Sequence, residues 1–316
     1  MKTFLESLKT ELQKQKLNDQ EIKEIIEDHE EMIEEAMNDG LNPEELNIKF
    51  GNPESLAKEL AEYKSNEPDQ SDLPKDQIKE YLFNLDEINK LNFKLLDEKI
   101  TIKKSSDTTY KVICLKGNPN RYIIDVSNGE LCIKRITKAG IKYRVFRPTD
   151  SCDFQLLIPN EHLLDSVMIQ SKSSDITISH LNTDILNIEG LSGDIDFEEV
   201  SAKNLHLKTI SGDVKMKRSI FDHIAMSLVS GNVNIDDIQI EGDVTIGTVS
   251  GDFSINNGQC NTLNYSAVSG DFKGIEFYPE KVSIRLVSGD FILENRQKEK
   301  TIEVLSQQSL SGEIKL

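Results

Sequence analysis

Apolar residues recur with two different periods along the chain. From residue 1 to about 64 the spacing is that of amphipathic helices, with Phe4, Leu5, Leu8, Leu12 and Leu17 on one stripe. From about residue 83 the period becomes two, as in half-buried β-strands, in segments such as KITIKKSS and FQLLIP. The change predicts a small helical domain at 1–64, a linker at 65–82 and a β domain at 83–316.

Within the helical part, helix starts and stops can be placed at particular residues. Asp19 is suited to cap a second helix, which ends near Gly40, and Asn42-Pro43 and Asn52-Pro53 are typical first residues of two short helices. The second helix turns one set of residues inward: Ile22, Ile25, Ile26, Met32, Ile33 and Met37. Because such short helices are marginal alone, we expect them to pack on one another or on a partner.

The tripeptide Ser-Gly-acid recurs through the β domain. Its glycines are 19, 19, 20, 19 and 19 residues apart, at Gly193, Gly212, Gly231, Gly251, Gly270 and Gly289, and Gly312 belongs to a last copy. In the six copies from Gly193 to Gly289, apolar residues stand six, four and one positions before the Ser, and three and five positions after it, apart from a lapse at Gly274. An earlier copy has Ser174-Asp175 and lacks the glycine.

Each copy is predicted to be two short strands hinged at the tripeptide. One copy cannot bury its own apolar residues, but stacked copies bury a continuous core, in which all five apolar positions are expected. The fold class is therefore mainly β, a parallel β-solenoid of about 19 residues per rung preceded by the helical domain. With strands ~4.8 Å apart, roughly eight rungs would span about 38 Å. Ser127-Asn128-Gly129 is a plausible hairpin turn before the repeats.

The tripeptide is interpreted as a structural corner. Glycine reaches positive φ without cost, and Ser and Asp hydrogen-bond nearby backbone groups. The predicted turn ladder consists of the seven glycines above with Asp194, Asp213, Asp252, Asp271 and Asp290. The alternative is a carboxylate ladder that binds calcium or another cation. Carboxylates one rung apart repel by roughly 0.9 kcal/mol in water, Asn232 interrupts the row, and the calcium nonapeptide is absent, which favours the corner.

The charge of the chain limits the partners to be expected. The formal net charge is -18, which argues against nucleic acid, because phosphate binding depends on clustered Lys and Arg. Residues 1–70 hold 8 Lys and 19 acids, an excess of 11 negative charges. The acidic helix face is either simply solvated or a docking surface for a basic partner. The start of the chain resembles no signal peptide and no window is apolar enough to span a membrane, so a cytoplasmic location is expected.

Candidate catalytic or metal-binding residues are few. The five histidines (His29, His162, His180, His206 and His223) stand at unrelated offsets within the copies, and the cysteines (Cys114, Cys132, Cys152 and Cys260) show no CxxC spacing. No nucleophile, phosphate-loop or zinc motif occurs, so we expect neither an enzyme nor a cofactor nor a metal. A carbohydrate-active solenoid remains an alternative and would need two opposed carboxylates.

Two segments resemble known families. SSDITI, LSGDIDF, ISGDVKM, VSGDFSI and VSGDFIL, preceded by FQLLIPNEHLLDSVMIQ, are similar to a bacterial β-strand-repeat family of unknown function that carries the label "putative adhesin". That resemblance covers roughly residues 85–316. Gly51-Asn52-Pro53-Glu54 and the following SLAKEL resemble the last turn and helix of the HAAS signalling domain of Gram-positive bacteria.

The resemblance implies a role in regulation and supplies no catalytic residues. Such repeat proteins are associated with cell-envelope stress systems of the Lia type, and HAAS domains accompany PadR-like transcription regulators. We therefore expect a non-enzymatic cytoplasmic signalling or scaffold protein, whose head docks a regulatory protein and whose solenoid contacts a second protein, the membrane periphery or, through its final rung, itself. The alternative is a cell-surface adhesin or ligand-binding solenoid.

Overall fold

The computed structural model describes residues 2–15, 17–19, 22–23, 25–26, 29–30, 52–65, 78–136, 151–160, 162–297 and 301–316. These residues fall into two compact units, a helical one up to Ser65 and a β one from residue 78 onward. No helix among the described residues is long and apolar enough to cross a membrane.

The helical unit contains α1 (Lys2–Lys14) and α4 (Pro53–Ser65). Its core is formed by three residues of the stripe predicted for the first helix, by two inward residues predicted for the second helix and by one side of α4: Phe4, Leu8, Leu12, Ile22, Ile25, Leu56, Ala57 and Leu60. Helix α4 begins as expected, because Pro53 is its first residue and the Asn52 side chain accepts a 2.8 Å hydrogen bond from the Glu54 N–H. Met32, Ile33, Met37, Gly40 and Pro43 lie outside the described residues.

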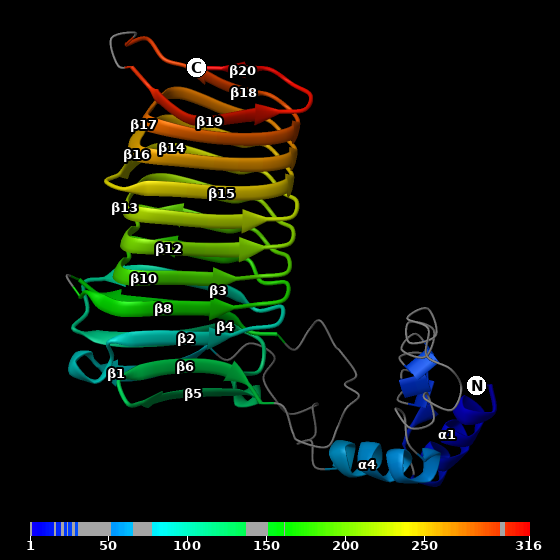
Figure 1. The fold of residues 1–316 in the computed structure, drawn as a ribbon. Helices are drawn as coiled ribbons and strands as arrows, with labels where there is room; N and C mark the ends of the chain where they lie inside the picture. The colour runs from blue at the N-terminus through cyan, green and yellow to red at the C-terminus, as the bar shows by residue number, and fades with distance from the viewer. Residues whose placement is uncertain are drawn as a thin grey trace. The chain divides into compact units, whose positions relative to one another are not determined.

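The β unit is a solenoid whose strands stack rung on rung (Figure 1). Its elements are β1 (Lys79–Asn84), η1 (Leu85–Glu87), β2 (Lys90–Lys94), β3 (Lys99–Ser105), β4 (Thr109–Lys116), η2 (Pro119–Arg121), β5 (Tyr122–Ser127), β6 (Glu130–Arg135), β7 (Asp153–Pro159), β8 (Leu164–Gln170), β9 (Ile176–Ser179), β10 (Asn182–Glu189), β11 (Ile195–Glu198), β12 (Ser201–Thr209), β13 (Val214–Leu228), β14 (Val233–Ile240), β15 (Asp243–Ser250), β16 (Phe253–Ser269), β17 (Phe272–Ser288), β18 (Phe291–Glu294), β19 (Glu303–Ser309) and β20 (Ile314–Lys315). Strand β1 begins at Lys79, inside the segment expected to be a linker.

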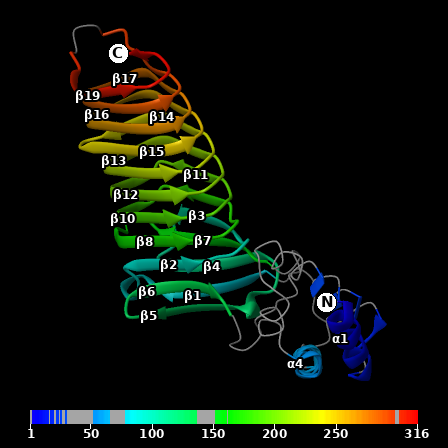
Figure 2. The same ribbon diagram turned by 45° about the vertical axis from the view of Figure 1, so that its right-hand side comes forward.

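The repeat sets the register of the parallel pairings. In β10, Leu186 pairs with Val167 of β8 on one side and with Leu205 of β12 on the other. The solenoid of about eight turns with a spacing of about 19 residues is therefore confirmed. Figures 1 and 2 show the rungs piled from β5 at one end to β19 and β20 at the other.

The order of the first rungs does not follow the chain. Strand β2 lies between β6 and β8, and β3 lies between β7 and β9. The predicted hairpin at Ser127-Asn128-Gly129 is present, because β5 and β6 are antiparallel and Asn128 and Gly129 have φ of 52° and 80°. Ile124 and Val126 of β5 pack against the core, so the hairpin covers one end of the stack.

The interior consists of columns of like residues one rung apart. Val214, Val233, Phe253, Phe272 and Phe291 form one column through β13, β14, β16, β17 and β18. All five are buried, and the rings of Phe272 and Phe291 stack at 4.4 Å. Gly274, where the apolar pattern is interrupted, leaves space in this core for the Leu293 side chain of the next rung. A Cβ at residue 274 would lie 2.4 Å from a methyl carbon of Leu293.

Candidate functional site

The tripeptide glycines form a vertical file at one corner of the solenoid. We call Gly193, Gly212, Gly231, Gly251, Gly270, Gly289 and Gly312 the glycine file, and their φ angles lie between 110° and 142°. A Cβ on Gly212 would lie 2.2 Å from the carbonyl oxygen of Gly193. Both the backbone angle and the close approach therefore exclude a side chain. Ser174 takes the first place in this file, where the sequence has no glycine.

The acids that follow these glycines form a second file. The N–H of Asp213 donates to Oδ1 of Asp194 at 2.9 Å, and the N–H of Asn232 donates to Oδ1 of Asp213 at 2.9 Å. The same bond recurs from rung to rung along the aspartate file: Asp175, Asp194, Asp213, Asn232, Asp252, Asp271, Asp290 and Glu313. One side-chain oxygen of each member but the last thus accepts a backbone N–H of the next rung, which partly offsets the repulsion between neighbouring carboxylates.

The apolar residue that precedes each tripeptide serine is not in the core. Leu191, Ile210, Val229, Val249, Val268 and Val287, which we call the aliphatic file, are between 45% and 49% exposed. The prediction that this position is buried was wrong. The positions six and four before the serine are inward, so alternation along the strand places the preceding residue outward. The inward place is taken by its neighbour, as at Thr209, whose hydroxyl donates to the Ser211 carbonyl at 3.0 Å.

The aliphatic file is a continuous apolar surface. The Ser230 N–H donates to the carbonyl of Ile210, and the Ser250 N–H donates to that of Val229, so successive members lie on adjacent rungs. At ~4.8 Å per rung, six members extend over about 24 Å. Single exposed aliphatic residues are ordinary on a protein surface, whereas an unbroken row of them is a candidate for an interaction surface. The glycine and aspartate files follow directly in the chain, so the row has a negatively charged border.

A second corner lies seven residues after each tripeptide serine. It is made by residues other than glycine with φ between 47° and 59°: His180, Glu199, Arg218, Asp237, Asn257 and Glu276. Side chains on adjacent rungs bridge there, as in the 3.1 Å ion pair between Arg218 and Glu199 and the 2.7 Å hydrogen bond from Asn257 to Asp237. This corner was not predicted from the sequence, because its residue types vary and only their constant offset from the serine identifies it.

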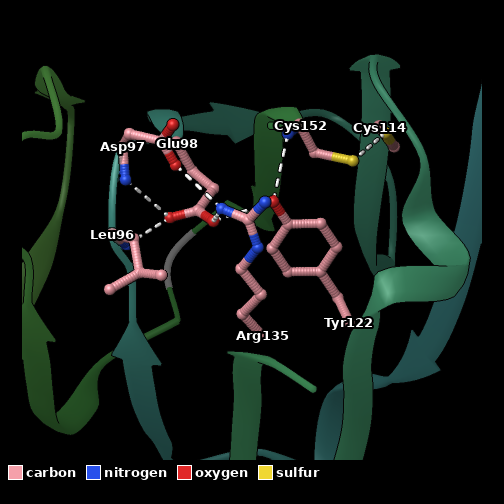
Figure 3. A network of polar contacts seen from close by, with 7 residues as sticks. All are labelled: Leu96, Asp97, Glu98, Cys114, Tyr122, Arg135 and Cys152. Atoms are coloured by element: carbon pink, nitrogen blue, oxygen red, sulfur yellow. Dashed lines mark hydrogen bonds and ion pairs between the residues drawn. The ribbon is translucent and has the colours of Figure 1, made fainter. Parts of the chain in front are cut away.

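A buried polar network lies near the first rungs (Figure 3). Glu98 is fully buried, accepts a 2.8 Å hydrogen bond from the Tyr122 hydroxyl, and lies 3.4 Å from Arg135. Arg135 also pairs with Asp97 at 2.9 Å, and the N–H groups of Leu96 and Asp97 donate to the Glu98 carboxylate. Burial, with the neighbouring Glu98 charge, raises the pKa of Tyr122. The carboxylate and guanidinium satisfy each other, as a buried ion pair requires.

Two buried thiols adjoin this network. The sulfur atoms of Cys114 and Cys152 are 2.9 Å apart, and the Cys152 N–H donates to the Tyr122 hydroxyl at 3.2 Å. The hydrogen bond to Cys152 lowers the pKa of the Cys114 thiol, while that bond and burial raise the pKa of Cys152. No local motif indicates this group of side chains, because the residues that meet are 24 to 38 positions apart in the chain.

The histidines are dispersed over the described chain. His162 contacts the Ile88 carbonyl at 3.0 Å, His180 lies 3.5 Å from Glu199, and Nδ1 of His223 accepts the Asp243 N–H at 3.2 Å. Nδ1 of His29 lies 2.7 Å from the Ile25 carbonyl. Within the described ranges, no three His, Cys, Asp or Glu residues are arranged to hold a metal ion. Most of the acidic helix EIIEDHEEMIEEAMNDG lies outside those ranges.

A comparison with solved structures finds matches from several bacteria. A "putative adhesin" from Bacteroides fragilis has 17% identity and a TM-score of 0.47, and the match covers 77% of this chain and 99% of that one. A "putative lipid binding protein" from Parabacteroides distasonis has 14% identity and a TM-score of 0.48, over 76% and 97% of the two chains. A "putative adhesin" from Parabacteroides merdae has 13% identity and a TM-score of 0.37, over 76% and 96%. A comparison with curated proteins finds no match.

Family models match both units of the chain. Residues 3–59 match the HAAS model, which confirms the resemblance of the helical head and supports protein partners. Residues 88–275, more than half of the chain, match the model described as Toastrack DUF4097. The strand-repeat family expected from the tripeptides is thereby confirmed, and the chain belongs to the DUF4097 Toastrack family.

Proposed function

We propose that the chain is a non-enzymatic cytoplasmic signalling or scaffold protein linked to cell-envelope stress regulation. The aliphatic file is the observation that carries this proposal. It offers a row of half-exposed aliphatic side chains held at fixed spacing by the backbone pairing of the rungs, and a preorganised apolar surface loses little conformational freedom when a protein binds to it. The aspartate file runs in one line, whereas glycoside hydrolysis would need two carboxylates opposed across a bound sugar.

The helical head is the second interaction element in this proposal. Its match to the HAAS model supports a protein partner, and we propose a PadR-like regulator. The acidic excess within residues 1–70 would attract a basic surface and reject an acidic one. The solenoid would then bind a second protein or contact the membrane periphery.

Site-specific photo-crosslinking in the producing cell tests the aliphatic file. A photoreactive residue at Val249 should give an adduct with one protein, whereas the same residue at Thr245, exposed on the same strand, should give none. Adducts from both positions, or from neither, would contradict a binding role for the file.

Calorimetry with a purified PadR-like regulator tests the head. Binding to the full chain should be lost in Leu8→Asp, which puts a charge into the core of the helical unit, and kept in Val249→Lys. Cell fractionation with surface proteolysis tests the location, because a surface adhesin would be cleaved on intact cells and a cytoplasmic protein would not.

A further inference from the structure

Within the described part of the chain, the rung formed by residues 301–316 is paired along one edge only. Strand β19 pairs with β17, and β20 pairs with β18, and neither has a second partner strand within the described part of the chain. Their backbone N–H and C=O groups on the far edge can therefore accept another strand. Every residue of β19 is exposed, and in this rung Leu305 and Leu310 are 53% and 84% exposed.

The two ends of the solenoid differ in how they are finished. At the β5 end, Ile124 and Val126 pack on the core. At the β19 end, the inward columns finish at Val304, Gln307 and Ser309, which lie over the buried Val282, Ile284 and Leu286. Gln307 thus occupies an inward position where the preceding rungs carry Tyr265 and Ile284. An amide side chain at this position could be buried only if another polar group formed hydrogen bonds with it.

We propose that this edge pairs with the same edge of a second copy, giving a two-fold dimer joined end to end. A two-fold axis makes the paired strands antiparallel. Opposed residues of an antiparallel pair point to the same face of the sheet, and side chains alternate along each strand. For both interiors to lie on the same side of the joined sheet, the two-fold axis must therefore pass between one residue and the same residue of the second copy. The shift in register at Val282/Ser283 leaves Ser306–Ser309 as the regular part of the edge.

Gln307 is the residue that fits the axis. Its side chain is the inward amide of the regular segment. On the axis it faces Gln307 of the second copy, and one of the two amides can donate a hydrogen bond that the other accepts. Ser306 then pairs with Gln308 of the second copy. Glu303 is the one charged residue of β19, so with Gln307 on the axis no two charged residues of the paired β19 strands lie opposite each other. A second copy therefore pairs the backbone groups of the edge and gives the Gln307 amide a polar partner.

The dimer should strengthen with salt. Each copy carries a formal net charge of -18, and the long-range repulsion between copies is screened when the Debye length falls from about 30 Å at 0.01 M to about 8 Å at 0.15 M ionic strength. This inference is independent of the proposed function, because the aliphatic file runs along the side of the solenoid and not across its end.

Sedimentation of the full chain over a range of concentrations, in low and in moderate salt, tests the proposal. The wild type should form dimers, with a dissociation constant that falls as salt is added. Gln307→Lys should remain monomeric, because it sets two like charges on the axis at a position that is exposed in the monomer. Gln259→Lys, an exposed position on β16, is the matched control and should dimerise as the wild type does, allowing for the small change in net charge.

A cysteine at the axis gives a second measurement. Gln307→Cys should oxidise to a covalent dimer, because residues facing across an antiparallel pair are close enough for a disulfide. Thr245→Cys, exposed on β15, should not. A wild type that stays monomeric at high concentration and moderate salt would overturn the proposal. So would a dimer that survives Gln307→Lys, or growth into open filaments, which indicates head-to-tail contacts.

Discussion

The backbone N–H of Asn232 donates a 2.9 Å hydrogen bond to the carboxylate of Asp213, and the amide oxygen of Asn232 accepts the next such bond from Asp252 at 3.1 Å. Asn232 therefore interrupts the charges of the aspartate file but not its hydrogen bonds. What the corner requires is a side-chain oxygen at a fixed place, and an amide supplies it as well as a carboxylate does.

Substitution of Asp213 separates the hydrogen bond from the charge. Asp213→Asn keeps the acceptor and removes one like-charge contact, so the free energy of unfolding should stay equal or rise slightly at low salt. Asp213→Ala leaves the Asn232 N–H without this acceptor and should cost about 1 kcal/mol. Urea unfolding of both variants is the measurement, and equal losses for Asn and Ala would contradict this account.

The glycine file allows a matched pair of alanine substitutions. Gly231→Ala should destabilise by about 2 kcal/mol or more, because φ is 114° and the new Cβ would lie 2.2 Å from the Gly212 carbonyl oxygen. At Gly247 a Cβ meets nothing within 4 Å, and φ is not in the positive region. Gly247→Ala should therefore leave the denaturation midpoint unchanged or raise it. A similar loss at both positions would argue against a steric corner.

Alanine substitutions on β15 test whether the aliphatic file is a surface or part of the core. Val249→Ala should change the free energy of unfolding by less than about 0.5 kcal/mol, because the side chain is already half exposed. Ile246→Ala, three residues earlier and fully buried, should cost about 2–5 kcal/mol. If Val249→Ala were as costly, the file would stabilise the fold and its exposure would need no partner.

The repeats could be predicted from local sequence. Deciding which side chains face the core and which face solvent required applying the strict alternation of side chains along each strand. The side chains of Leu205 and Leu207 point inward. Because side chains alternate along a strand, Ile210, an odd number of residues later, points outward, and this alternation is already contained in the sequence. The second corner lies at a constant offset from each tripeptide. Residue type does not indicate it, because Glu199 and Arg218 are not typical turn residues.

Other features depend on contacts between distant parts of the chain. Nothing local indicates that β2 is placed between β6 and β8, because its own pattern is that of any half-buried strand. In the sequence, Glu98 looks like an ordinary acidic residue near a turn. It is a buried ion-pair partner only because the fold places Tyr122 and Arg135 against its carboxylate. Long-range pairing of this kind leaves no periodic signature in one sequence.

Glu98 should be among the most costly polar residues to remove. Glu98→Ala leaves Arg135 buried with only part of its negative environment, and we expect a loss of about 3–5 kcal/mol. Tyr122→Phe removes one hydrogen bond to the same carboxylate and should cost about 1–2 kcal/mol. The double variant Glu98→Leu with Arg135→Met should recover much of the first loss. A double variant less stable than Glu98→Ala would contradict the ion-pair account.

Cys260 should make stability fall at alkaline pH. Burial, with smaller effects of Asp243 and Glu280, raises the pKa of its thiol to about 12. In the unfolded chain the thiol has an ordinary pKa of about 8.5. Above that pH the unfolded chain loses a proton that the folded chain keeps, so stability is fully present below about pH 8.5 and declines as pH rises toward 12. Cys260→Ala should flatten the decline in denaturation midpoint, and an unchanged slope would contradict this assignment.

The place of β2 also has a consequence for synthesis on the ribosome. Asn89, directly before β2, bonds the side chain of Asp165, which is made 76 residues later. At about 5–20 residues per second, β2 waits for several seconds before both neighbouring strands exist. The nascent chain must therefore leave at least one edge of this segment unpaired until β8 emerges, and the first rungs close only after the middle of the polypeptide has left the exit tunnel.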